Sequence, residues 1–423
     1  MIRLILTIAT LVAVAACSNN PESTESRSSQ TALVDGEWRF SLKLEQKELP
    51  FKVEITGVNT SEPNGSIHND SEKIPLADVK VMGDSVFLHT SHFDSEFKLR
   101  IESPNLMTGA WYNYEKETPP ITTIAEFGKD YRFTPSRSSI PVEKQYKVKF
   151  YETDSDPWDA ILVLRNNEGR LSGTFLTETG DYRYLDGNVM NNSIYLSTFD
   201  GSHAFLFQAE IKEDSLINGT FHSGVHYSAT WNGVADDEFQ LRNPKNLTFL
   251  NEGYKEFDFA LPNQDGDTVS WKDLNLNGKV VIVDIMGSWC PNCIDANKAL
   301  KTLLEPYSDD EVKLVNIAFE RTENLEKARK SVSKMQKNIG LSEKFIFGGK
   351  ASKNNAAQKL PSLNHIMSFP TLIFIDKQRN VEQIYTGFYG PGTGKYYDDF
   401  MQETEALLKQ LVDAPSNGNG LAD

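Results

Sequence analysis

The chain has 423 residues, of which 39% are hydrophobic and 24% are charged. The length predicts about three domains. The composition is that of a soluble globular protein, and it excludes wholesale disorder and a multi-span membrane protein. The formal net charge of −16 disfavours a nucleic-acid partner bound through a basic surface. Three cysteines are too few for a disulfide scaffold.

Residues 1–16 have the pattern of a secretory signal peptide. One positive charge at Arg3 precedes an uncharged apolar run over residues 4–16, which is shorter than the about 20 residues that cross a bilayer. Residues 14–17 (VAAC) resemble the lipobox of bacterial lipoproteins, in which the cysteine is acylated and becomes the first mature residue. We therefore expect Cys17 to be lipidated. An ordinary secretory signal that contains a cysteine is the alternative.

Polar residues dominate both ends of the predicted mature chain. Residues 17–34 cannot bury enough apolar area to fold, so they are expected to be a flexible tether. Residues 413–423 are expected to be a disordered tail. Ser18 stands where Gram-negative lipoproteins that stay at the inner membrane carry aspartate, which favours the outer membrane. The folded part is thus expected to face the periplasm.

Short alternating strands and turn residues fill the region from 35 to 240. The pattern is typical of antiparallel sheets with one solvated face. Four matches at offsets of 108 to 110 residues indicate a duplication: Gly65-Ser66-Ile67 with Gly173-Thr174-Phe175, Ser85–Leu88 with Ser193–Leu196, Gly109-Ala110-Trp111 with Gly219-Thr220-Phe221, and Phe40 with Phe150. We expect two all-β units, residues 35–139 and 140–240, each a sandwich or a lipocalin-like barrel. Chance similarity between strands is the alternative.

No binding site is predicted in the β units. His203, His222 and His226 have no Cys, Asp or Glu beside them at a ligand spacing, so no metal site is expected. Six aromatic residues are expected to form core rather than a ligand pocket: Trp38, Phe87, Trp111, Tyr195, Phe207 and Trp231.

Residues 250–412 have an α/β pattern. The near-continuous apolar run over residues 280–286 (VVIVDIM) predicts a strand covered on both faces. The other predicted elements are a helix over 294–304, a buried strand over 314–319, an amphipathic helix over 323–338, strands over 371–375 and 381–385, and a helix over 396–411. The expected order is β-α-β-α-β-β-α.

Two motifs in this region carry a family resemblance. Trp289-Cys290-Pro291-Asn292-Cys293 lies between a strand and a helix, and Phe369-Pro370-Thr371 opens a later strand. This ordered set resembles the thioredoxin fold, and the lead-in before residue 280 is similar to that of membrane-tethered TlpA/ResA-type thiol–disulfide oxidoreductases. The resemblance covers residues 252–412 and not the β units. It implies an α/β thioredoxin-like domain that exchanges disulfides with client proteins.

A cysteine pair at this spacing places Cys290 at a helix N-terminus and Cys293 one turn inside. Unpaired N–H groups and the helix dipole favour a thiolate at Cys290, whose pKa in such motifs falls below ~8.5. We expect Cys290 to be the exposed nucleophile and Cys293 to be the resolving thiol. The alternatives are a zinc knuckle and an inert disulfide, but no further Cys/His pair has a matching spacing. No cofactor and no metal are expected.

The resemblance also assigns roles to neighbours of the dithiol. It implies that Asp284 lies beneath the second cysteine, where desolvation would raise its pKa and let it take the proton of Cys293. It implies that Trp289 shields one side of the sulfur. A cis bond before Pro370 would leave nearby backbone free to pair with an extended client. Glu320 is either an acidic neighbour of the dithiol or a solvated strand end.

These expectations combine into one function. The protein is expected to be a lipid-anchored envelope oxidoreductase of the protein-disulfide reductase type, with client proteins and an upstream electron donor as partners. The dipeptide Pro291-Asn292 differs from the Gly-Pro of cytosolic thioredoxins, so the redox direction stays open. One alternative is an AhpC-type thiol peroxidase, although residues 287–289 do not supply the Pro-x-x-x-Thr pattern. The other is a non-catalytic binding lipoprotein.

Overall fold

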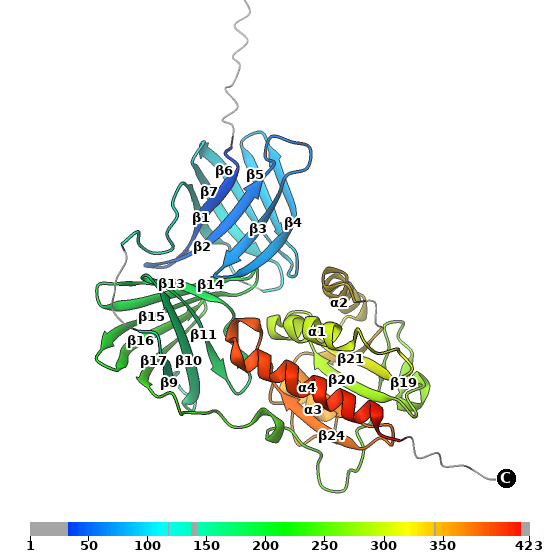
Figure 1. Cartoon of the computed structure of the whole chain (residues 1–423). Coiled ribbons are helices and arrows are strands. Elements are labelled where there is room, and N and C mark those ends of the chain that lie inside the picture. The colour runs from blue at the N-terminus through cyan, green and yellow to red at the C-terminus, as the bar shows by residue number, and fades with distance from the viewer. Residues whose placement is uncertain (1–32, 117, 137–141, 342–343, 416–423) are drawn as a thin grey trace, which may run out of the picture.

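The computed structural model describes residues 33–116, 118–136, 142–341 and 344–415. Figure 1 shows two β barrels, one above the other, and an α/β domain beside them. The signal segment, Cys17 and nearly all of the tether lie outside the described residues. Among the residues that the structure describes, no helix is long and apolar enough to span a membrane.

The first barrel is a closed ring of eight antiparallel strands. β1 pairs with both β2 and β8, so the sheet has no free edge. Alternate side chains point inward, and Trp38, Phe40, Phe51 and Phe97 are fully buried there. The strands are β1 (Gly36–Leu44), β2 (Lys47–Thr56), β3 (Asn64–Asn69), β4 (Glu72–Met82), β5 (Ser85–Thr90), β6 (Ser95–Ser103), β7 (Leu106–Asn113) and β8 (Ile121–Phe127).

The second barrel repeats this architecture. Eight of its strands form a ring that the β10–β11 pairing closes, and the short strand β12 adds to β11 as a hairpin. The strands are β9 (Gln145–Tyr151), β10 (Trp158–Asn167), β11 (Arg170–Thr177), β12 (Gly180–Asp181), β13 (Leu185–Met190), β14 (Ser193–Phe199), β15 (Ala204–Lys212), β16 (Ser215–Ser223) and β17 (Tyr227–Ala235).

The tandem all-β prediction is confirmed, and each sequence match falls on equivalent strands of the two rings. Gly65 and Gly173 both lie on the third strand, and Gly109 and Gly219 both lie on the seventh. A Cβ at any of the four would come within 2.6 Å of a carbonyl oxygen on a neighbouring strand. The repeated glycines therefore mark places where the strands approach too closely for a side chain.

The prediction of six core aromatic residues is partly wrong. Trp38, Trp111, Phe207 and Trp231 are buried, whereas Phe87 and Tyr195 are only half-buried. The two exceptions lie at corresponding positions of β5 and β14, on the face of each strand that points away from the barrel core.

The C-terminal domain is a five-stranded sheet in the order β22-β21-β20-β23-β24. β20 lies at its centre, parallel to β21 and antiparallel to β23. Helices α1, α2 and α4 pack on one face, and the lead-in segment packs on the other with α3. The elements are η1 (Pro244–Asn246), β18 (Ala260–Pro262), β19 (Thr268–Ser270), η2 (Trp271–Leu274), β20 (Val280–Met286), α1 (Pro291–Leu304), β21 (Val312–Glu320), α2 (Leu325–Ile339), β22 (Phe345–Lys350), α3 (Lys353–Lys359), β23 (Thr371–Ile375), β24 (Val381–Thr386), η3 (Pro391–Thr393) and α4 (Lys395–Asp413).

The predicted element order lacks two elements that the structure contains. Strand β22 contains two glycines, residues 348–349, before its last residue Lys350, and glycine is unfavourable in strands. Helix α3 is seven residues of largely polar sequence with one buried side chain, so it has no apolar periodicity to detect. Both follow α2, in a segment to which no element was assigned from the sequence.

Candidate active site

Cys290 and Cys293 form a disulfide at the start of α1. Cys290 is the N-cap residue, Pro291 occupies the first turn, and the Cys293 backbone N–H lies 3.2 Å from Cys290 Sγ. Gly287 lies between β20 and this helix. A side chain does not fit at this position, because a Cβ would meet Nε1 of the Trp289 ring at 2.3 Å. In the reduced protein the same N–H group and the helix dipole favour a thiolate at Cys290.

The expectation of an exposed nucleophile is wrong for this arrangement of the chain. Cys290 is 5% exposed and Cys293 is fully buried. Both belong to an apolar cluster that includes Phe93 of the first barrel. No motif in the sequence connects the β units to the dithiol, so the presence of Phe93 in this cluster was not predicted.

Trp289 lies beside the dithiol and is held in place on three sides. Its indole N–H donates to the Phe319 carbonyl at 2.9 Å. The ring packs edge-on against Phe369, and the Arg321 guanidinium lies 5.2 Å from the ring centroid. These contacts fix an aromatic wall at the edge of the cluster that contains both cysteines.

Pro370 is brought to the dithiol by the loop before β23. The Phe369–Pro370 peptide is cis, as the motif predicts. The Phe369 carbonyl oxygen lies 3.3 Å from Cys290 Sγ, and the Pro370 carbonyl accepts from the Gly387 N–H. The loop thus borders Cys290 Sγ directly.

Asp284 is buried in the central strand with no exposed surface. Desolvation by burial raises the pKa of its carboxyl to about 7. Asn297 donates to the carboxylate at 2.6 Å and to the Cys293 carbonyl at 2.9 Å. The amide therefore connects Asp284 to the turn of α1 that carries Cys293.

Two asparagines of this polar cluster were missed by the sequence analysis. Asn316 lies opposite Asp284 in the parallel β20–β21 pair, and Asn297 lies four residues after Cys293 on α1. Both are fully buried. A buried polar side chain in an otherwise apolar strand, and an amide one turn after the resolving cysteine, are signals that could have identified them.

Glu320 is a buried neighbour of the active-site loop, so the interpretation as a solvated strand end is wrong. Its carboxylate accepts from the Ser288 N–H and hydroxyl, both at 2.7 Å. Desolvation raises the pKa of Glu320 to about 7. Because Ser288 lies two residues before Cys290, this contact anchors the turn between β20 and α1.

The histidines singled out in the β units have other partners. His203 lies 3.0 Å from an Asp200 oxygen, and His222 lies 2.9 Å from Lys47 Nζ. Among the described residues, no three His, Cys, Asp or Glu side chains gather as a metal site would require.

Comparisons with known proteins match the C-terminal domain. The model of the AhpC/TSA family matches residues 253–384. Thioredoxin-like protein YneN of Bacillus subtilis (strain 168) is 25% identical over 138 residues, which is 33% of this chain and 73% of that protein.

Solved structures match the same part of the chain. A putative thiol:disulfide interchange protein DsbE from Chlorobium tepidum is 21% identical, with 38% of this chain and 97% of that chain covered and a TM-score of 0.28. A DsbF homologue from Corynebacterium diphtheriae is 20% identical, with 40% and 98% covered and a TM-score of 0.28. The C-terminal domain is thioredoxin-like and similar to the AhpC/TSA family, and the similarity covers this domain alone.

Proposed function

We propose that the protein is a membrane-anchored thiol–disulfide oxidoreductase that acts on client proteins of the bacterial cell envelope. The observation that carries this proposal is the Cys290–Cys293 disulfide at the N-terminus of α1. It lies beside a cis-proline loop, and Asn297 connects the Cys293 main chain to a buried carboxylate of raised pKa. These are the groups that thiol–disulfide exchange requires: an activated thiol, a resolving thiol and a proton acceptor.

In the reductive direction, the Cys290 thiolate attacks one sulfur of a client disulfide. The client S–S bond breaks, a Cys290–client bond forms, and the second client sulfur leaves as a thiolate that takes up a proton. Cys293 then attacks Cys290 Sγ, closes the Cys290–Cys293 disulfide and releases the client dithiol. Two electrons pass to the client, and a dithiol donor of the envelope restores the reduced protein.

Asp284 is proposed to accept the Cys293 proton during the second step. A carboxyl with a pKa of about 7 can hold or release a proton at neutral pH. Asn297 fixes its orientation by bonding both the carboxylate and the Cys293 backbone. Trp289 and Pro370 are proposed to border the client rather than to transfer protons.

Trapping of covalent intermediates tests the assignment of the two cysteines. Cys293→Ser is expected to accumulate mixed disulfides with client proteins through Cys290, because the resolving thiol is absent. Cys290→Ser should accumulate none, since Cys293 is fully buried. Non-reducing gels of envelope extracts, with and without dithiothreitol, give the readout. Equal adduct yields from both variants would remove the assignment.

Anchoring through Cys17 is proposed from the sequence alone. The lipobox-like residues 14–17 and the polar tether support lipidation of Cys17 and a periplasmic orientation. Cys17→Ser is expected to move the protein from the membrane fraction to the soluble fraction. Unchanged membrane association would contradict the anchor.

Thiol peroxidase activity is the second candidate, because the description of the matched family includes AhpC. The residues before Cys290 are Gly287, Ser288 and Trp289, so the threonine of the peroxidatic pattern is absent. We therefore expect slow peroxide consumption together with rapid disulfide exchange. A peroxide-consumption assay with dithiothreitol as the reductant distinguishes the two activities.

A further inference from the structure

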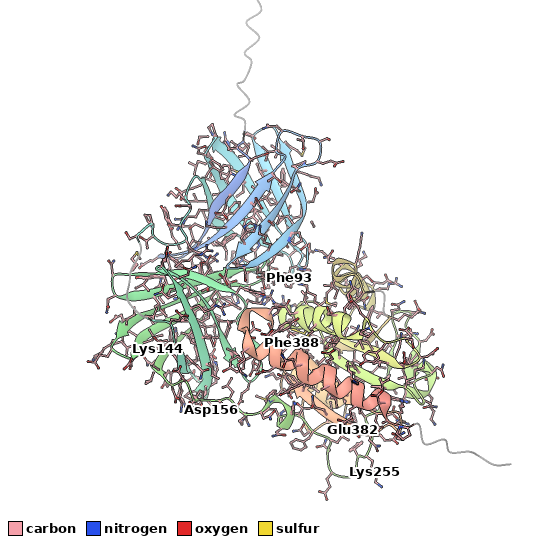
Figure 2. All side chains as sticks on the ribbon, viewed as in Figure 1. Phe93, Lys144, Asp156, Lys255, Glu382 and Phe388 are labelled. Atoms are coloured by element: carbon pink, nitrogen blue, oxygen red, sulfur yellow. A yellow bond between two sulfur atoms is a disulfide. The ribbon has the colours of Figure 1, made fainter. Side chains whose placement is uncertain are left out.

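Loops from both β barrels lie against the dithiol. One is residues 91–94, between β5 and β6 of the first barrel, and the other is residues 178–181, at the tip of the β11–β12 hairpin. We call these two loops the barrel cover. Figure 2 shows Phe93 of the first loop at the junction between the first barrel and the α/β domain.

The hairpin tip bonds to residues on two sides of Cys290. The Ser368 hydroxyl, from the loop that carries the cis proline, donates to the Thr179 carbonyl at 2.6 Å. The Asn292 amide, from the turn between the cysteines, donates to the Asp181 carbonyl at 3.3 Å. Backbone carbonyls of the hairpin tip therefore already accept hydrogen bonds from the segments on both sides of Cys290.

The same hairpin is packed tightly on the loop after β24. The Gly390 N–H donates to the Asp181 carboxylate at 2.6 Å, and the Tyr389 hydroxyl donates to the Thr177 carbonyl at 3.0 Å. A Cβ at Gly387 would lie 3.0 Å from the carbonyl carbon of Thr179. The hairpin and the loop after β24 are thus in direct contact, through side chains at Asp181 and Tyr389 and through close main chain at Gly387.

The first barrel closes the site from the side of α2. Phe93 is buried in the cluster that contains both cysteines, Val332 and Met335. Lys334 donates to the Phe93 carbonyl at 2.7 Å. The aromatic ring therefore belongs to the same buried apolar cluster as the dithiol and is held there from α2.

A buried arginine ties the cover together. Arg183, just after the hairpin, pairs with Asp295 on α1 and with Glu72 on β4. One side chain of the second barrel thereby connects all three domains, and its charge is removed from solvent. Separation of the domains would have to break both ion pairs at once.

We propose that residues 178–181 occupy the client-binding surface as an intramolecular stand-in for a client, and that the barrel cover must move away from Cys290 before a protein client binds. The proposal rests on the proposed function and adds its regulation. The closed arrangement keeps the dithiol from folded proteins, while small thiol reagents reach the sulfur far more readily. The competing reading is that the barrels only support the domain and never separate from it.

Gly180→Ala weakens the cover without changing a cysteine, Asp284 or the cis proline. A Cβ at Gly180 would meet the Asn292 amide nitrogen at 2.0 Å, and its φ of +135° disfavours any side chain. Gly83→Ala is the matched control, because Gly83 also has a positive φ but its Cβ would have nothing within 4 Å. The full chain is used for wild type and both variants.

The reduced proteins are treated with N-ethylmaleimide or with a maleimide that carries a polyethylene-glycol chain, and modification of Cys290 is followed by mass. The bulky reagent reacts only with the open arrangement, so Gly180→Ala should raise its rate by about tenfold or more relative to N-ethylmaleimide. Gly83→Ala should leave the ratio unchanged. A ratio in Gly180→Ala equal to that of wild type would overturn the proposal.

Hydrogen exchange tests whether a bound client displaces the barrel cover, and it needs no substitution in the cover itself. The sample is Cys293→Ser joined by a mixed disulfide at Cys290 to a cysteine-containing peptide. In this adduct the amides around residues 177–183 and of Gly390 should exchange faster than in the unreacted variant. The exchange rates of the amides in β1 and β2 should stay unchanged. Unaltered protection of these amides in the adduct would also refute the proposal. If Cys290 exchanged with neither glutathione disulfide nor the peptide, the proposed function itself would fail.

Discussion

One amide nitrogen of Asn297 donates to the buried carboxylate of Asp284 at 2.6 Å. The same nitrogen donates to the main chain of Cys293, so a single side chain connects the proposed proton acceptor with the proposed resolving cysteine. The carboxylate has no other hydrogen bond within the described part of the chain. Its protonation state therefore depends on burial and on this one donor.

Asp284 makes the stability of the oxidised protein depend on pH. Burial raises the pKa of this carboxyl from 3.8 to about 7, so the folded state holds the proton more tightly than the unfolded state does. The stabilisation from the neutral carboxyl is fully present below pH 3.8 and is lost as pH rises to about 7. Asp284→Asn stays neutral, so we expect its stability relative to wild type to rise through this window by on the order of 4 kcal/mol.

Urea unfolding of wild type and Asp284→Asn at the two ends of the pH window measures this difference. Asp265→Asn, on an exposed turn, is the control and should show no such trend. A difference between wild type and Asp284→Asn that stays constant with pH would contradict the raised pKa.

Removal of the Asn297 side-chain donor should shift the pH dependence of the step in which Cys293 resolves the mixed disulfide. Without the hydrogen bond that lowers it, the pKa of Asp284 rises further, because burial then acts alone. We expect Asn297→Ala to shift the midpoint of mixed-disulfide decay upward by about one pH unit. Thr302→Ala, on the exposed face of the same helix, is the control. Slower decay with an unshifted midpoint would mean that Asn297 is only structural.

The sequence predicted the parts of the protein whose signals are local. The run over 280–286, the cysteine spacing and the proline before Thr371 are each visible within a few residues, and together they define the thioredoxin-like domain. The duplicated β units were predictable because their glycines recur at equivalent strands.

Contacts between distant segments could not be predicted in the same way. Thr179 and Ser368 carry no motif, and their hydrogen bond depends on how two separately patterned domains pack. Phe93 belongs to the buried cluster that contains Cys290, yet it lies in a turn between two strands of another domain and carries no motif. Periodicity indicates which face of an element is apolar, but not which domain will bury it.

Ser288 and Glu320 should act as one unit in stability. Ser288→Ala leaves a buried carboxylate with one donor instead of two, so a loss of about 1–3 kcal/mol is expected. Glu320→Gln should cost a similar amount, because the hydroxyl and the N–H then compete for one acceptor. The double variant is expected to lose less unfolding free energy than the sum of the losses in the two single variants, since each change removes the same contact. Unfolding free energies of the four proteins decide this, and strict additivity would show that the two residues are energetically independent.

Arg183 is expected to be the most sensitive charged residue at the domain junction. It pairs with Asp295 and Glu72, and all three side chains are largely removed from solvent. Arg183→Met fills a similar volume but leaves Glu72 without its cation and Asp295 with Lys298 alone. Removal of one partner of a buried pair typically costs about 3–5 kcal/mol. Arg100→Met, which removes an exposed pair with Asp84 on the first barrel, is the control and should change stability little. The loss in Arg183→Met should shrink as pH is lowered, because burial raises the pKa of Glu72 and a protonated Glu72 no longer needs the arginine. Denaturant unfolding of wild type and both variants at neutral and mildly acidic pH measures these effects. If the two arginine variants lost the same stability at every pH, burial of the Arg183 pairs would have no energetic consequence.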